Sequence, residues 1–245
     1  SAGMQKILKD AKPTCIEDLI ALNALFRPGP MDNIPQFCNC KNGKEKIKYP
    51  HPDLEPILKN TYGVIVYQEQ VMQVVQKIGG FSLGKADTLR RYMSKKKVKE
   101  MEKMKDEFIP GAKERGYTEK LANEIFDLLI PFSKYGFNKS HAAAYSVVAY
   151  KTAYLKKHYP AEFMAANLTN EIGNPDNFKL YLSEVRNLGI KMLPPNINIS
   201  DKFFSVAKGQ IIYGIQGIKN TGGAVVEEII NKRNLGGPYK DFCDF

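Results

Sequence analysis

The sequence has few of the residues that build metal sites or disulfide frameworks. Its four cysteines, Cys15, Cys38, Cys40 and Cys243, follow no framework spacing, and the close pair at 38 and 40 has only the isolated His51 beside it. This pattern excludes a zinc knuckle and a disulfide-stapled secreted domain. We expect reduced thiols, as in a protein of the cytosol.

Motifs of phosphate-activating enzymes are also missing. There is no Gly-x-x-x-x-Gly-Lys-Ser/Thr loop and no His-Glu-x-x-His helix. Asp32, Asp53, Asp106 and Asp201 stand isolated, so the clustered aspartates that hold two metal ions for phosphoryl transfer are not present. The chain has groups that bind phosphates but no evident set that activates them.

The sequence has neither a signal peptide nor an apolar run of about 18 residues, and we expect a soluble protein that is not exported. Residues 1–3 resemble an added flank. The chain also stops abruptly at Phe245, within an aromatic segment. We therefore expect a piece of a larger protein.

Positive charge is abundant and concentrated. The chain has 245 residues, is 43% hydrophobic and has a net charge of +10, which is enough apolar content for one or two domains. Residues 85–105 contain nine basic and three acidic residues. Residues 133–157 contain five lysines and no acidic residue. Such focusing predicts a surface that meets phosphates, with a solvated lysine-rich face as the alternative.

The segment from Ser133 to Ser146, SKYGFNKSHAAAYS, is the most informative part of the sequence. A glycine turn and the potential cap Asn138 precede a helix predicted from Lys139 to Lys157. Unpaired N–H groups at a helix start, with lysines and His141 beside them, predict an anion site. Alternatively, Lys134 is solvated and Asn138 serves only as a cap.

Two aromatic rings follow at helical spacing. His141 and Tyr145 are four residues apart and share a predicted face with Val148 and Thr152. They would stack on a base or hydrogen-bond a phosphate. An ordinary core stripe with a satisfied histidine is the alternative.

Arginine is used sparingly, since only six of the 36 basic residues are arginine. Arg90 and Arg91 are nonetheless adjacent, which suggests a site that needs the planar guanidinium for bidentate phosphate contacts. On a helix, one arginine would face a ligand while the other braces against Asp87. The alternative is a surface salt bridge from Asp87 to Arg91.

Periodicity predicts a mainly α fold. The expected architecture is a helical body over residues 4–190, followed by a small α+β part with a short β-hairpin over 191–245. Expected helices are 14–25, with Thr14 and Glu17 as a capping box, then 68–78, 83–93, 96–115, 118–132, 139–157, 160–169, 174–187 and 224–233. Residues 32–62 are expected to be loop-like, and residues 202–206 and 210–213 to pair as strands.

Glycines recur between residues 214 and 223. They would form a hairpin between short helices whose backbone N–H groups touch DNA phosphate. A turn without a ligand is the alternative.

Several long motifs resemble one family in order along the chain. They are ALFRPGPM (24–31), TYGVIVYQEQVM (61–72), LRRYMSKKK (89–97), YGFNKSHAAAY (135–145), YPAEFMA (159–165) and LPPNIN (193–198). The sequence is similar to the alpha subunit of bacterial DNA polymerase III, a C-family replicative polymerase. The resemblance covers nearly the whole chain and implies the fingers domain.

The resemblance also implies roles for particular residues. Nucleotide contacts fall on Arg90, Arg91, Asn138, Lys139, Ser140 and His141. DNA contacts are expected for Lys95, Lys96, Lys97, Lys134 and Tyr145, with solvent as the alternative for the three consecutive lysines. Two Mg²⁺ ions would be held by the palm of the full-length protein, outside this segment.

The sequence therefore predicts a polymerase fingers domain that binds the triphosphate of a deoxynucleoside triphosphate (dNTP) and primer-template DNA, and that is inactive alone. Implied partners are the palm of the same polypeptide and replisome subunits such as the sliding clamp, reached through other domains, in the bacterial cytoplasm and not at a membrane. The alternatives are a non-catalytic DNA-binding module and a replisome interaction domain.

Overall fold

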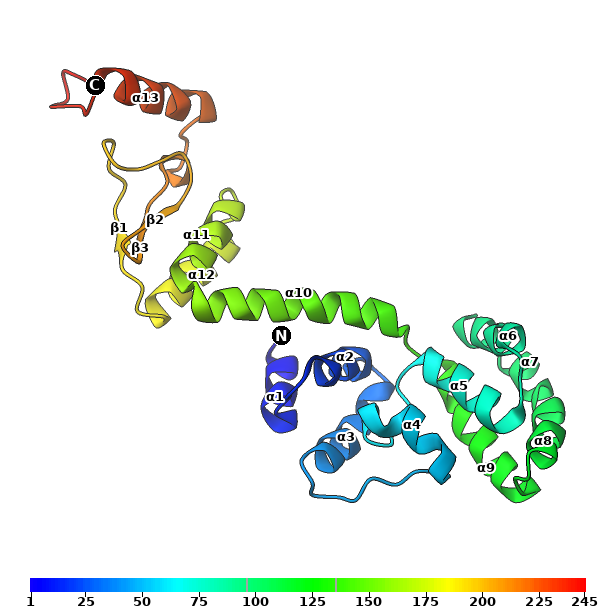
Figure 1. Ribbon diagram of the computed structural model, residues 1–245. Helices are drawn as coiled ribbons and strands as arrows, with labels where there is room; N and C mark the ends of the chain where they lie inside the picture. The colour runs from blue at the N-terminus through cyan, green and yellow to red at the C-terminus, as the bar shows by residue number, and fades with distance from the viewer. Residues whose placement is uncertain (96, 135) are drawn as a thin grey trace. The chain divides into compact units, whose positions relative to one another are not determined.

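Helices dominate the chain, and a small sheet lies near its C-terminus (Figure 1). The computed structural model describes residues 1–95, 97–134 and 136–245, with only the backbone for 133 and 134. The chain divides into two compact units, Ser1–Tyr150 and Lys151–Phe245. The mainly α fold with a small β part, predicted from periodicity, is confirmed.

The first unit begins with a series of short helices, of which α1, α2 and α3 share one apolar cluster. Their bounds are α1 Ala2–Ala11, α2 Ile16–Leu25, η1 Pro30–Asn33, α3 Ile34–Lys41, η2 Pro52–Leu54, α4 Glu55–Leu58 and η3 Lys59–Thr61. The prediction of a loop over 32–62 was wrong. Ile34, Phe37 and Cys38 bury one face of α3, and Pro35 lies in its first turn, where a missing N–H costs no helical hydrogen bond.

The predicted capping box at α2 was wrong by one residue. Cys15 rather than Thr14 is the N-cap, and Asp18 rather than Glu17 reaches back. Asp18 Oδ2 accepts from the backbone N of Thr14 at 2.8 Å and of Cys15 at 3.4 Å. An aspartate three residues after the cap therefore does what the glutamate was expected to do.

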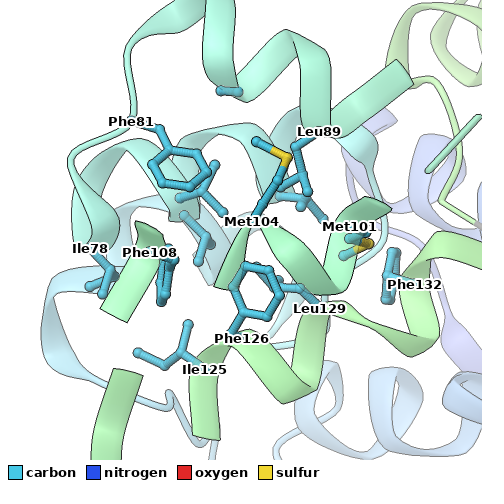
Figure 2. Close-up of a cluster of buried hydrophobic side chains, with 14 of the residues drawn as sticks. Ile78, Phe81, Leu89, Met101, Met104, Phe108, Ile125, Phe126, Leu129 and Phe132 are labelled. Atoms are coloured by element: carbon cyan, nitrogen blue, oxygen red, sulfur yellow. The ribbon is translucent and has the colours of Figure 1, made fainter. Parts of the chain in front are cut away.

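The larger core of this unit lies among the next five helices. They are α5 Gln68–Gly79, α6 Leu83–Ser94, α7 Val98–Lys103, α8 Lys105–Glu114 and α9 Glu119–Leu129, followed by η4 Pro131–Lys134. Figure 2 shows their buried side chains, among which Phe108 packs between Phe81 and Phe126. Ser82 and Thr118 cap α6 and α9 as predicted.

The predicted single helix over 96–115 is two helices, α7 and α8, which meet at Met104. Pro110 lies inside α8, where its missing N–H removes the helical hydrogen bond to the carbonyl of Asp106, yet the helix continues to Glu114. The neighbouring Gly111 lets α8 approach α5 closely, since a Cβ there would collide with the carbonyl oxygen of Gly79. Glycine is therefore required by packing at this crossing.

The helix α10 Lys139–His158 follows and passes from the first unit into the second. Near the start of this helix, the side chains of Ala142 and Ser146 are buried. Asn23 Nδ2 of α2 donates a hydrogen bond to Ser146 Oγ at 2.8 Å. The start of α10 is thereby fixed to the body of the first unit.

The second unit contains α11 Pro160–Asn170, α12 Pro175–Asn187, a three-stranded sheet, η5 Ile215–Gly217 and α13 Gly223–Gly236. The strands are β1 Met192–Leu193, β2 Ser205–Ala207 and β3 Gln210–Ile212, in the order β1-β3-β2. Strands β2 and β3 form the predicted antiparallel hairpin, whereas β1, parallel to β3, was not predicted. Lys208 and Gly209 both have positive φ, which suits a two-residue hairpin turn.

The core of this unit joins helices to the sheet. Leu168 of α11 and Val185 of α12 are buried with Phe204 and Ile211. The domain limits predicted at 4–190 and 191–245 stay a prediction. The boundary between the two compact units lies earlier in the chain, at residues 150 and 151, because α11 and α12 share a core with the strands. Residues 2 and 3, expected to be a flank, lie in α1 with Ser1 as its N-cap.

Candidate functional site

The last turns of α6 present the two adjacent arginines. Arg90 contacts Asp87 Oδ1 through Nη2 at 2.7 Å and Nε at 2.8 Å. Arg91 Nε donates to Asp87 Oδ2 at 2.9 Å. Both arginines therefore brace against Asp87, where the sequence predicted only one. Hydrogen bonds from Arg90, and then from Arg91, lower the pKa of Asp87, so the carboxylate stays charged and orients both guanidinium groups.

This ion-paired cluster remains open to solvent. The side chain of Arg91 is 68% exposed and that of Arg90 is 32% exposed. A guanidinium has five donors in a planar fork, so a group held through Nε still offers its terminal N–H groups. The predicted salt bridge to Arg91 is therefore present, and it leaves the arginine able to bind an anion.

The start of α10 is more occupied than the sequence predicted. Asn138 Oδ1 accepts from His141 N at 2.9 Å and from Ser140 Oγ at 2.6 Å, as a helix cap does. The backbone N of Lys139 donates to both carboxylate oxygens of Glu69, each at 3.1 Å. An internal carboxylate thus already lies at the positive end of this helix.

The aromatic groups of this region form a row. The guanidinium of Arg27 lies 4.4 Å from the ring centroid of Phe137. Phe137 contacts His141 edge-on at 5.5 Å, and His141 lies 4.7 Å from Tyr145. His141 and Tyr145 are exposed, Tyr145 to 63%, so the core-stripe alternative was wrong. Burial lowers the pKa of Arg27.

The start of α5 joins these two groups of residues. Tyr67 and Phe137 form a parallel β-bridge, and Gln68 N donates to Phe137 O at 2.9 Å. Gly136 lies so close to α6 that a Cβ would be 3.0 Å from the terminal methyl of Met93. The end of α6, the start of α5 and the start of α10 therefore meet within the first unit.

Two of the lysines predicted to contact DNA, Lys95 and Lys97, lie at the end of α6 and just after it. Lys95 is the C-cap of α6 and is exposed, and Lys97 precedes α7 and pairs with Glu100 at 3.4 Å. Lys96 and the side chain of Lys134 lie outside the described residues. Lys85 and Lys105, at the ends of the basic run, pair with Glu107 and Asp127.

The glycine segment of the second unit forms a hairpin. Residues 218–222 link η5 to α13, with Thr221 N donating to Ile218 O at 3.2 Å and Gln216 Nε2 to Thr221 O at 3.1 Å. Asn220 has a φ of +68°, and Lys219 is exposed at the tip. The 3₁₀-helix η5, the tight turn and the helix α13 that follows correspond to the predicted hairpin.

The described residues contain neither a cluster of metal ligands nor a helix that could cross a membrane. Within residues 1–95, 97–134 and 136–245, no three His, Cys, Asp or Glu side chains gather where they would hold a metal ion. Nor is any helix in that part of the chain both long and apolar enough to span a bilayer.

The whole sequence aligns with one set of curated proteins. It is 62% identical over its full length to a protein of Borreliella burgdorferi named DNA polymerase III subunit alpha. Proteins of the same name from Thermus aquaticus and Bacillus subtilis are 48% and 47% identical, again over 100% of this chain. This chain belongs to the bacterial DNA polymerase III alpha subunit family. The resemblance identified from sequence motifs is confirmed.

Two family models match separate parts of the chain. Residues 1–116 match the finger domain of the bacterial DNA polymerase III alpha subunit, and residues 189–245 match a helix-hairpin-helix motif. The chain spans only about a fifth of these relatives, 21% of the Borreliella burgdorferi protein, 22% of the Bacillus subtilis protein and 20% of the Thermus aquaticus protein. The second match supports the hairpin predicted from the glycines at 214–223.

Three residues of this region were not predicted from the sequence. Arg27, Gln68 and Glu69 lie far from the basic runs in the chain yet contact them in space. The signal available was the position of Gln68 and Glu69, polar residues directly after the apolar run 64–67. Their partners, at residues 94 and 136–139, depend on tertiary contacts that no local pattern encodes.

Proposed function

We propose that the intact protein is a DNA-directed DNA polymerase and that this segment binds the incoming dNTP through its triphosphate. The observation that supports this most strongly is the solvent-accessible guanidinium pair of α6, held by Asp87 beside the start of α10, in a chain 62% identical to a DNA polymerase III subunit alpha. Arg90, Arg91, Lys139 and His141 would face the nucleotide, with Asn138 and Ser140 shaping the turn.

The contribution of these residues is electrostatic. Arg90 and Arg91 would neutralise the charge that develops on the leaving pyrophosphate, and Lys139 would add a third cation. Because Asp87 fixes both guanidinium groups before a ligand arrives, little reorganisation is needed on binding. The backbone N–H of Lys139 already binds Glu69, so the side chain of Lys139 rather than its N–H is the group proposed to reach phosphate.

The described residues do not fit a site for the two Mg²⁺ ions, since no suitable cluster of ligands exists among them. We place those ions in the palm of the full-length protein. The segment alone is then inactive in synthesis. The proposed setting is the bacterial cytoplasm, with the palm and other replisome subunits, including the sliding clamp, as neighbours.

A second proposed function is contact with primer-template DNA. The helix-hairpin-helix match at residues 189–245 favours it, because hairpins between short helices present backbone N–H groups that suit DNA phosphates. Lys95, Lys96, Lys97 and Lys134 would supply further phosphate contacts, and the exposed ring of Tyr145 a surface for a base.

Steady-state kinetics of the full-length protein test the nucleotide assignment. Arg91→Ala should lower kcat/KM for dNTP by about 10- to 100-fold, as expected for losing a charge-assisted hydrogen bond, with primer-template affinity largely retained. Arg186→Ala, an exposed helical arginine of the second unit, is the matched control and should have no effect.

Unchanged kinetics in Arg91→Ala would refute the triphosphate assignment. If DNA affinity instead fell steeply with salt while nucleotides had no effect on either protein, a non-catalytic DNA-binding module would be the better description. No response to either ligand would favour a replisome interaction domain.

A further inference from the structure

The amide of Gln68 connects the two groups of residues proposed to contact the nucleotide. It lies in the first turn of α5 and is only 8% exposed. Its Nε2 donates to Ser94 Oγ of α6 at 3.2 Å and to the carbonyl oxygen of Gly136 at 3.0 Å. One side chain therefore bridges the arginine helix and the turn before α10.

Each end of this bridge leads directly to a candidate site residue. Ser94 Oγ donates to the backbone oxygen of Arg90 at 3.0 Å, one turn back along α6. On the other side, the backbone N of Gln68 donates to Phe137 O at 2.9 Å, and Phe137 immediately precedes the cap Asn138. The buried Gln68 therefore lies between these two contacts and connects them.

We propose that Gln68 is a positioning residue that holds Arg90 and Arg91 in register with the start of α10. This inference rests on the proposed nucleotide contact. Gln68 touches neither phosphate nor base in this scheme. It sets the separation of two cationic groups that must reach one triphosphate, and small displacements of such groups reduce binding strongly.

Gln70 provides a control on the same helix. It is also a buried glutamine, 5% exposed, and its amide makes four hydrogen bonds. Its partners are Val66, Tyr67, Ile57 and Thr61, which precede α5 and lie on neither α6 nor α10. A loss of stability alone should therefore appear equally in substitutions of either glutamine.

The experiment compares Gln68→Met with Gln70→Met in the full-length protein. Methionine keeps the side-chain length and removes the amide. We expect Gln68→Met to raise the KM for dNTP about tenfold, with primer-template affinity within about twofold of the parent protein. Gln70→Met should lower the melting temperature comparably and leave the KM unchanged.

Ser94→Ala is a milder second variant on an exposed side chain, and it tests the same bridge if Gln68→Met does not fold. It should raise the KM about threefold. Combined with Gln68→Met, it should add little, because both changes break the same contact. Independent multiplication of the two effects would contradict the bridge.

Arg91→Ala, measured in parallel, distinguishes the two proposals. Suppose that Arg91→Ala raises the KM for dNTP but Gln68→Met and Ser94→Ala do not. Gln68 is then not a positioning residue, and the nucleotide site stands. The same conclusion follows if Gln70→Met raises the KM as much as Gln68→Met does. If Arg91→Ala itself has no effect, the nucleotide assignment fails, and the role of Gln68 fails with it.

Discussion

At the scale of single residues, Asp18 shows how a buried charge is tolerated. It is fully buried, and so is most of the side chain of its ion-pair partner Lys41, at 3.3 Å. Burial by itself would raise the pKa of Asp18. Hydrogen bonds from Thr14 N and Tyr62, together with the Lys41 charge, outweigh burial and lower that pKa.

The lowered pKa sets the sign of an acid dependence. An unfolded aspartate has a pKa of about 3.9, so near and below that pH the unfolded chain binds more protons than the folded one. Stability contributed by Asp18 is therefore present above about pH 4 and is lost as the pH falls through the folded value. Asp18→Asn should lower the free energy of unfolding at neutral pH by about 3 kcal/mol.

Thermal melting of the parent and Asp18→Asn chains between pH 7 and pH 3 checks this prediction. The difference in melting temperature between the parent and Asp18→Asn chains should narrow as the pH falls. A constant difference across this range would mean that the ionisation of Asp18 does not contribute. Asp10→Asn, an exposed carboxylate on α1, serves as the control.

At the scale of elements, the crossing of α5 and α8 depends on glycine. Gly79 and Gly111 lie where side chains would collide with Phe108 and with the Gly79 carbonyl, respectively. Gly111→Ala should lower the free energy of unfolding by about 2 kcal/mol, because the helices must separate to admit the methyl group.

Denaturant unfolding compares Gly111→Ala with Gly84→Ala. Gly84 lies in α6 with no heavy atom within 4 Å of its potential Cβ, and alanine there should stabilise by about 0.5 kcal/mol through helix propensity. The opposite signs of the two changes in the free energy of unfolding distinguish an effect of helix packing from an effect of helix propensity. If both substitutions stabilised the protein, the close approach would be of no consequence.

Elements were predictable from sequence where the signal is local. Ser82 and Thr118 begin α6 and α9 because a hydroxyl caps the backbone of residues that follow directly. Helix α3 was missed because prolines and asparagines in residues 32–62 outweighed a short apolar periodicity. The single helix expected over 96–115 is broken at Met104, a buried core residue that no local sequence signal marks as a helix end.

In the candidate site, too, some residues have a local sequence signal and others do not. Arg90, Arg91, Asn138 and His141 could be predicted as candidate residues because charge and capping are visible along the chain. Glu69 and Gln68 were not, since their partners lie about 70 and 26 to 68 positions away in the chain. The sequence thus indicated the groups that we propose to contact an anion, but not the side chains that hold them in place.

At the scale of the whole molecule, excess charge bears on DNA binding. The net charge of +10 favours a polyanionic partner, and the hairpin tip of the second unit contributes the exposed Lys219. Lys219→Ala in the full-length protein should weaken primer-template binding regardless of base sequence. It should also reduce the slope of log affinity against log salt by about 1.

Fluorescence anisotropy with labelled primer-template at several salt concentrations measures that slope. Lys179→Ala removes an equal charge from an exposed position on α12 and is the control. Equal slopes for the two variants would show that the hairpin tip is only part of a diffuse positive field.

The double capping of α10 has a consequence for the side chains far along that helix. Because Asn138 and Glu69 both bind its first backbone N–H groups, the residue at which winding starts is fixed. Each position advances about 100° around the axis, so this anchor sets the azimuth of every later ring and lysine. One residue inserted after Asn138 would rotate the entire outer face by more than a quarter turn, although every side chain on it would be retained.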